Sequence, residues 1–176
     1  MTEVIIERHP DQPLTPADAV AIIEGGNDCR AIHRLTWHGS LLSADGQQMV
    51  CHLTSPDVES VRIALKGALR PMKVDVWPCT VRDAPDLDPA ELERANVLAC
   101  FRFERQVAPD ELTAIESGAG ICLQNQRVRV LRTFVASNGR RALCLCLAAD
   151  AESVRIALRV AQPKVERISA VQHFTG

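Results

Sequence analysis

A seven-residue string, Glu-Ser-Val-Arg-Ile-Ala-Leu, occurs twice in this chain, at Glu59–Leu65 and again at Glu152–Leu158, 93 residues apart. Cys51 with Cys144 and Gly46 with Gly139 keep the same spacing, as do Cys29 with Cys122 and Asp57 with Asp150. Solenoid repeats are about 20–50 residues long, so this period is too large for one of them. It has the size of a small domain. The sequence therefore predicts one fold written twice.

Each half shows the same order of local signals. In the first half Thr15-Pro16 marks a helix start, Asp45-Gly46 a hairpin turn, and Ser55-Pro56-Asp57 a second helix start. The expected elements are strand 4–9, helix 17–24, hairpin strands 34–43 and 48–54, helix 57–69 and strand 73–81. The second half gives strand 97–105, helix 109–122, hairpin strands 128–137 and 141–147 across Asn138-Gly139, helix 150–160 and strand 165–174.

The order β-α-β-β-α-β is that of the ferredoxin-like fold, a four-stranded antiparallel sheet with both helices on one face. The predicted fold class is α+β, with two tandem ferredoxin-like units. The expected domains are residues 1–82 and 97–176, joined by an acidic linker at 83–96 that contains Pro85 and Pro89.

Composition excludes several classes of partner. A net charge of −2 and a pI near 6.2 give no basic surface for nucleic acid or an anionic membrane. The third strand of each half has no aromatic residue and the chain has no Tyr, which argues against RNA recognition. Seven cysteines without a secretory segment argue against a disulfide framework. We therefore expect a cytoplasmic protein that binds neither nucleic acid nor membrane, and homodimerisation is left open.

Alternation along the strands predicts which side chains share the helix-free face of each sheet. Glu7 and His9 lie on this expected face in the first strand, and Arg102 and Glu104 in the fifth. The hairpins are expected to add Thr36, His38, Ser40, Leu42, Met49, Cys51 and Leu53, and in the second half Leu131, Thr133, Val135, Ala142, Cys144 and Cys146. This face is mixed in polarity. We therefore expect the two sheets to face each other, as in an intramolecular dimeric α/β barrel, with a ligand site between them.

Three interpretations of this face stay open. A transition metal such as nickel would use His38 and Cys51, with His9 or Glu7, because imidazole and thiolate suit such ions. A small organic molecule would use Arg102, Ser40 and Thr133 as polar anchors. In the third interpretation there is no site, and His38 is a core histidine with satisfied hydrogen bonds.

Four strings carry a family resemblance: Ile-Glu-Arg at Ile6–Arg8, Phe-Glu-Arg at Phe103–Arg105, Asp-Gly-Gln-Gln-Met-Val-Cys at 45–51, and Asp-Ala-Glu-Ser-Val-Arg-Ile-Ala-Leu at 150–158. The chain resembles a bacterial family of small ferredoxin-like proteins, a domain of unknown function related to a nickel-binding protein, here in tandem. The resemblance implies a dimeric α/β barrel and nickel, or another transition metal, as the bound ion.

The sequence thus favours a small-ligand or metal binding or sensing module over an enzyme. The leading alternative is a small-substrate isomerase or oxygenase, with His38 as acid/base and Arg102 holding an anionic substrate. A purely structural or oligomerisation role is the third option.

Overall fold

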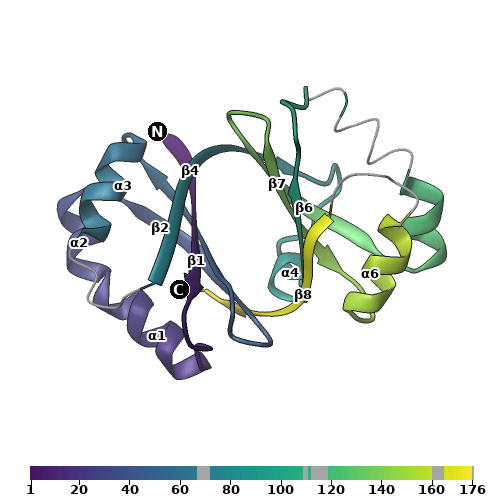
Figure 1. Ribbon diagram of the computed structural model, residues 1–176, viewed down its shortest axis with the longest axis horizontal. Coiled ribbons are helices and arrows are strands. Elements are labelled where there is room, and N and C mark those ends of the chain that lie inside the picture. Colours follow the sequence, from purple (N-terminus) through teal and green to yellow (C-terminus); the bar gives the residue numbers. More distant parts are fainter. Residues whose placement is uncertain (67–71, 109–110, 112–118, 160–164, 176) are drawn as a thin grey trace. The chain divides into compact units, whose positions relative to one another are not determined.

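The computed structural model describes residues 1–66, 72–108, 111, 119–159 and 165–175. The chain forms two compact units, and each of them combines helices with an antiparallel sheet (Figure 1). Unit 1 consists of Met1–Cys79 together with Gln172–Gly176, and unit 2 of Thr80–Val171. The expected α+β class is confirmed. No helix among the described residues has both the length and the apolar character needed to cross a bilayer.

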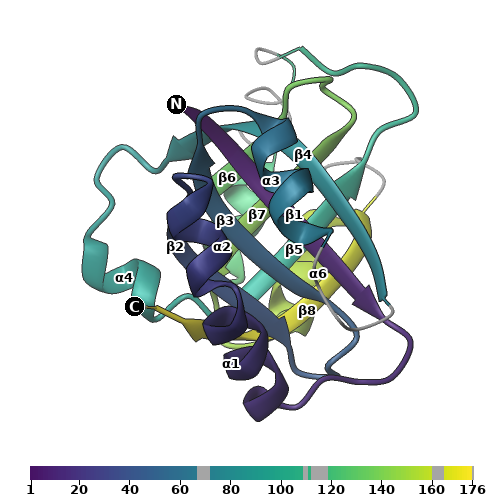
Figure 2. The same ribbon diagram turned by 90° about the vertical axis from the view of Figure 1, so that its left-hand side faces the viewer.

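Unit 1 contains the sheet order β4-β1-β3-β2, with every neighbouring pair antiparallel. Its strands are β1 (Thr2–Pro10), β2 (Thr36–Ser43), β3 (Met49–Ser55) and β4 (Met72–Asp83), the last of which passes into unit 2 after Cys79. Its helices are α1 (Pro16–Gly25), α2 (Asn27–Ile32) and α3 (Val58–Leu65). Figure 2 shows these three helices in front of strands β1 and β3.

Helix α1 begins where the sequence predicts. Thr15 is the N-cap: its Oγ1 accepts a hydrogen bond from the Asp18 amide at 3.2 Å, while the Thr15 amide donates to Asp18 Oδ2 at 3.0 Å. Pro16 suits the first helical position, since it lacks the amide hydrogen that would otherwise need a partner. Helix α2, which was not predicted, follows at once because Gly26 ends α1 and begins α2.

Unit 2 repeats the strand order, as β8-β5-β7-β6, again antiparallel throughout. Its elements are β5 (Val97–Arg102), β6 (Arg129–Ala136), β7 (Arg141–Leu147), β8 (Val165–Phe174), α4 (Pro89–Glu93) and α6 (Ala151–Leu158). Strand β8 passes into unit 1 after Val171. Residues 119–125 are helical, and much of the helix predicted at 109–122 lies outside the described residues. Helix α4 lies within the segment predicted as a linker.

The two predicted hairpin turns both contain a left-handed glycine. Gly46 has a φ of 69° and Gly139 a φ of 63°. Each glycine carbonyl also accepts a hydrogen bond from the loop that follows the first strand of its half, from the Leu14 amide at 2.9 Å and from the Val107 amide at 2.9 Å. The turn therefore joins the hairpin to that loop in both repeats.

The predicted facing of the third strand in each repeat is wrong. The buried clusters that include helix residues contain these strand side chains: Met49, Cys51 and Leu53 in unit 1, and Ala142, Cys144 and Cys146 in unit 2. These residues therefore face the helices. The opposite row is also buried, with Leu143 2% and Leu145 3% exposed, so burial did not distinguish the two rows. The leucines of β7 are larger than its Ala and Cys side chains, and for that reason they were expected to face the helices. In the structure the helices pack over the smaller Ala and Cys side chains instead.

A β-bulge in each hairpin changes which side chains of the second strand face the helices. The register shifts between Trp37 and Gly39, and between Val130 and Arg132. Because a bulge adds one residue, Trp37 and Ser40 reach the same helix-facing side, where Trp37 Nε1 donates to Ser40 Oγ at 3.0 Å. Ser40 and Thr133 were thus placed on the wrong face, and His38 on the right one.

The N-caps of helices α3 and α6, which contain the repeated string, predict that part of the protein's stability is lost at acid pH. Asp57 Oδ1 accepts the Ser60 amide at 2.7 Å, and Asp150 Oδ1 accepts the Ser153 amide at 2.7 Å. Chiefly through these backbone hydrogen bonds, the pKa of each carboxyl is lowered. A carboxyl whose pKa is lower in the folded state than in the unfolded state stabilises the fold at pH values above its unfolded pKa of about 3.9. This contribution to stability is lost as the pH falls through the folded pKa.

We therefore expect Asp57→Ala to lower the urea midpoint at pH 7, with a difference from wild type that narrows towards pH 3. Asp57→Asn keeps a hydrogen-bond acceptor without the charge, so it should fall between the two at pH 7. Urea denaturation at several pH values measures this. A difference between Asp57→Ala and wild type that stays constant with pH would show that the charge of the cap contributes nothing.

Candidate metal centre

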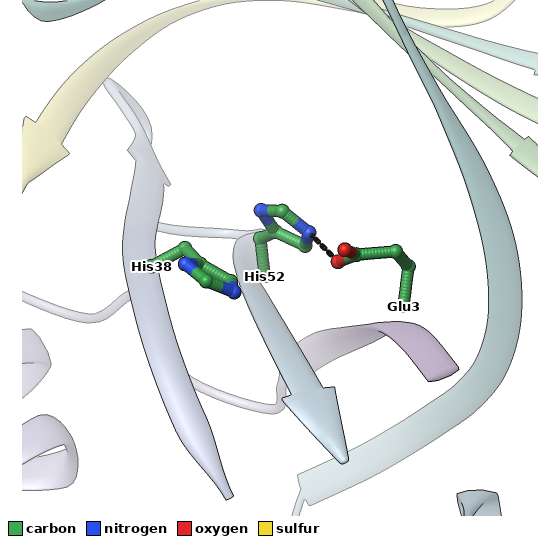
Figure 3. Close-up of side chains that lie close together, drawn as sticks. All are labelled: Glu3, His38 and His52. Carbon is green, nitrogen blue, oxygen red and sulfur yellow. Dashed lines mark hydrogen bonds and ion pairs between the residues drawn. The ribbon is translucent and has the colours of Figure 1, made fainter. Parts of the chain in front are cut away.

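Three potential metal ligands gather on the face of the unit 1 sheet that lies opposite its helices (Figure 3). Glu3 comes from β1, His38 from β2 and His52 from β3, so the group spans three adjacent strands. Glu3 and His52 directly adjoin the helix-facing residues Val4 and Cys51 along their strands, and alternation places them on the other face. The bulge turns His38 to the same side.

The three side chains already contact one another or their neighbours through polar atoms. His52 Nε2 lies 2.6 Å from Glu3 Oε2, and His38 Nε2 lies 3.0 Å from Thr54 Oγ1. The two imidazole rings have centroids 4.7 Å apart. The Glu3 side chain is 36% exposed and that of His52 13%, and His38 is exposed. An ion from solvent can therefore reach the group.

The separation of the ligand atoms fits one ion after small side-chain rotations. One ligand atom from each residue lies within 4.8 Å of the other two. Two ligands bound to one ion at about 2.0–2.2 Å can be no more than roughly 4.4 Å apart. Binding would therefore replace the hydrogen bond between His52 and Glu3 and draw His38 inwards.

Glu7 and His9, two of the sequence candidates, do not belong to this group. The Glu7 carboxylate is 6% exposed and accepts hydrogen bonds from Trp77 Nε1 at 2.7 Å and Gln48 Nε2 at 3.2 Å. His9 Nε2 lies 3.9 Å from Glu7 Oε2. These contacts give Glu7 a structural role in which it accepts hydrogen bonds from buried donors.

The structure also separates the other candidates from His38. Cys51 lies on the helix side, where its sulfur accepts hydrogen bonds from Arg8 Nη1 at 3.0 Å and Ser40 Oγ at 2.9 Å. The expected pairing of His38 with Cys51 is therefore wrong, because adjacent rows of one sheet point to opposite faces. Thr133 likewise contacts a helix-side sulfur, that of Cys144, at 3.5 Å.

Arg102 belongs to unit 2 and has a surface role. Its Nε donates to Glu166 Oε1 at 3.0 Å, and both side chains are 49% exposed. This exposed ion pair does not form a site for an anionic substrate.

Sequence reasoning missed Glu3 and His52. A correct facing of β3 would have found His52, since it then shares the face of His38, and Glu3 pairs with the neighbouring Thr54. The signal was present in the alternation, but the larger leucines of the second repeat favoured the opposite facing.

The second repeat has lost the whole ligand set. At the 93-residue offset, Asn96, Leu131 and Leu145 replace Glu3, His38 and His52. Asn96 instead joins β5 to the end of β7: its Nδ2 donates to the Ala148 carbonyl at 2.8 Å, and its Oδ1 accepts the Ala148 amide at 3.0 Å. The repeated fold therefore does not require the polar group, and the described part of the chain has one candidate centre of this kind.

Comparison with known proteins gives a likeness in fold. No family model matches the chain, and no curated protein matches it. The chain is similar to the solved structure of a provisionally named chlorite dismutase, at 10% identity and a TM-score of 0.52 over 99% of this chain and 96% of that one. A heme-binding protein from Thermus thermophilus matches at 9% identity and a TM-score of 0.51, over 98% of this chain and 91% of that one.

A provisionally named monooxygenase from Lactobacillus acidophilus NCFM matches at 10% identity and a TM-score of 0.50, over 98% of this chain and 94% of that one. At such identities these likenesses show the fold alone.

Proposed function

We propose that the protein is a metal-binding module that holds one divalent transition ion at Glu3, His38 and His52. The observation that carries this proposal is the convergence of two imidazoles and one carboxylate from three adjacent strands within 4.8 Å. Imidazole suits zinc, copper, iron and nickel, and two histidines with one carboxylate leave coordination positions open. The resemblance of the sequence to a family related to a nickel-binding protein supports nickel as the first ion to test.

The open positions are what would make such a centre useful. Three protein ligands leave at least one position for water or a small molecule on a tetrahedral ion, and more on an octahedral one. A small ligand would then be recognised through its bond to the ion. This supports binding or sensing of a small ligand as the function.

Heme, which the Thermus protein binds, does not fit the smaller of two hollows among the described residues of unit 1. This hollow lies between the sheet and its helices, has a volume of about 60 Å³ and has no histidine in its lining. Sites for drug-sized ligands and cofactors have volumes of about 300–1,000 Å³. We therefore derive no role for heme from this pocket.

Metal binding can be tested by native mass spectrometry of the full chain, as purified and after titration with NiCl₂ and with ZnCl₂. We expect one ion per chain. His52→Leu and His38→Leu copy the residues of the second repeat, and each should weaken binding by more than about 100-fold, since the loss of a hydrogen-bond partner of a ligand alone costs 10–100-fold.

His9→Leu is the matched control, because it removes an imidazole of the same unit from outside the group. It should leave the stoichiometry and the affinity unchanged. A wild-type chain that retains neither ion, or a retained ion that survives both His52→Leu and His38→Leu, would refute the proposed centre.

A further inference from the structure

A second feature of unit 1 lies on the helix side of the same sheet. The hollow of about 60 Å³ between the sheet and helices α1, α2 and α3 is walled mainly by aliphatic side chains. Two arginines, Arg8 and Arg30, also line it, together with Trp37 and Cys51. A volume of this size has room for a few water molecules, so a ligand there would have only a few heavy atoms.

The arginines bring positive charge into this apolar space. Arg8 is 9% exposed, and its contact among the described residues is the hydrogen bond to Cys51 Sγ at 3.0 Å. A thiol is a weak acceptor, while a guanidinium has five donors. No Asp or Glu of the described residues lies within ion-pair distance of Arg8 or Arg30. Among the described residues the other guanidinium donors of Arg8 have no acceptor and are not fully buried, so they are available to a ligand.

Arg30 approaches the hollow from helix α2. Its Nη1 donates to the Ile23 carbonyl at 2.7 Å, its Nη2 donates to Asn27 Oδ1, and its guanidinium lies 5.5 Å from the ring centroid of Trp37. The pKa of Arg30 is lowered, chiefly by burial; Cys51 acts to raise it, and the charge of Arg8 acts to lower it. The two cations are therefore close enough to repel each other, and a shared anion would relieve that repulsion.

The second repeat shows that the fold does not need these charges. At the same 93-residue offset, Phe101 stands for Arg8, Leu123 for Arg30 and Val130 for Trp37, while Cys144 and Thr133 keep the places of Cys51 and Ser40. Phe101, Leu123 and Val130 all pack in the apolar core of unit 2. The first repeat thus has two guanidiniums around a hollow where the second repeat has apolar core side chains.

We propose that this hollow binds a small carboxylate anion of about four heavy atoms, such as acetate, between Arg8 and Arg30. The carboxylate would accept hydrogen bonds from both guanidiniums, and its short apolar end would contact the aliphatic walls. A wider hollow of about 310 Å³ shares Ile23, Arg30 and Trp37 with this site and reaches Phe174, which offers a route of entry. The site is separate from the proposed metal centre: within β3, Cys51 lies beside it and His52 faces away.

Ligand-observed NMR of acetate, titrated onto the full chain at constant ionic strength, tests the proposal. Saturable binding is expected for wild type. Arg8→Met and Arg30→Met should each weaken it by about tenfold or more, because a charge-assisted bidentate contact is lost. Arg102→Met, which removes a surface arginine of unit 2, and His52→Leu, which removes the metal centre, should both leave acetate binding unchanged.

Stability measurements distinguish this role from a structural one. If the role of Arg8 is to bind an anion, the urea midpoint of Arg8→Met without acetate should equal or exceed that of wild type. The reason is that an apolar side chain packs well against the apolar walls of the hollow. If Arg8 instead has a structural role as the donor to Cys51, Arg8→Met should have a lower urea midpoint than wild type both with and without acetate. That second result, or the absence of saturable acetate binding to wild type, would overturn the proposal.

Discussion

Gly46→Ala is expected to lower the free energy of unfolding by about 2–4 kcal/mol. Gly46 has a φ of 69°, which a residue with a Cβ rarely adopts. A Cβ at this position would also lie 2.4 Å from the Leu14 carbonyl oxygen and 2.8 Å from the Leu14 nitrogen. Both are backbone atoms, so the turn must move away from the loop that follows β1. The hydrogen bond from the Leu14 amide to the Gly46 carbonyl is then lost. Urea denaturation followed by circular dichroism measures the change.

Gly25→Ala is the control for this substitution. A Cβ at Gly25 meets nothing within 4 Å, and Gly25 is the last residue of helix α1, before its C-cap Gly26. Alanine there should be neutral or stabilise by up to about 1 kcal/mol. Gly139→Ala should behave like Gly46→Ala, because its Cβ would lie 2.8 Å from the Val107 carbonyl oxygen. If Gly46→Ala proved as stable as Gly25→Ala, the contact between turn and loop would not be part of the folded state in solution.

Glu7→Ala is expected to destabilise the protein by a similar amount, about 2–5 kcal/mol, because it leaves two buried donors without their acceptor. The carboxylate accepts from Trp77 Nε1 at 2.7 Å and from Gln48 Nε2 at 3.2 Å. Each donor would lose its hydrogen bond in a place that water does not readily reach. Urea denaturation gives the loss of stability, and in a Trp37→Phe background the tryptophan emission of the folded variant reports on Trp77.

Glu7→Gln separates the acceptor from the charge. Glutamine keeps an oxygen that Trp77 can donate to, so its effect should be no more than about half that of alanine. Equal effects of the two substitutions would mean that charge, and not the hydrogen bonds, stabilises this position. Neither variant should change metal binding, because Glu7 lies outside the proposed centre.

The local elements were predictable because their signals are contained in a few adjacent residues. The capping pair of Thr15 and Asp18, the glycine turns and the Asp57 cap each depend on contacts within a single turn. Which face of a strand meets the helices is decided by the whole core, and here both faces are buried. The bulge at Trp37–Gly39 then shifted the alternation by one residue, and no residue type marks such a shift with certainty. The expected packing of the two sheets against each other stays a prediction.

The candidate centre depended on that same facing. His38 was predicted on the correct face, yet its expected partner Cys51 points the other way, and His52, one residue later, takes its place. Arg8, which follows Glu7 in the sequence, was not among the candidate ligands, and its Nη1 donates to the buried sulfur of Cys51. The side-chain contact between Arg8 and Cys51 joins residues about 40 positions apart. If the facing of one strand is predicted wrongly, all the contacts predicted for its side chains are therefore wrong.

The division of the chain between its units has a consequence for synthesis on the ribosome. Unit 2, Thr80–Val171, is one continuous stretch, whereas unit 1 also needs Gln172–Gly176. Phe174 from that last segment packs against the core of unit 1. Unit 1 is therefore completed only after the whole of unit 2 has been synthesised, and until then the part of its core that Phe174 contacts stays uncovered.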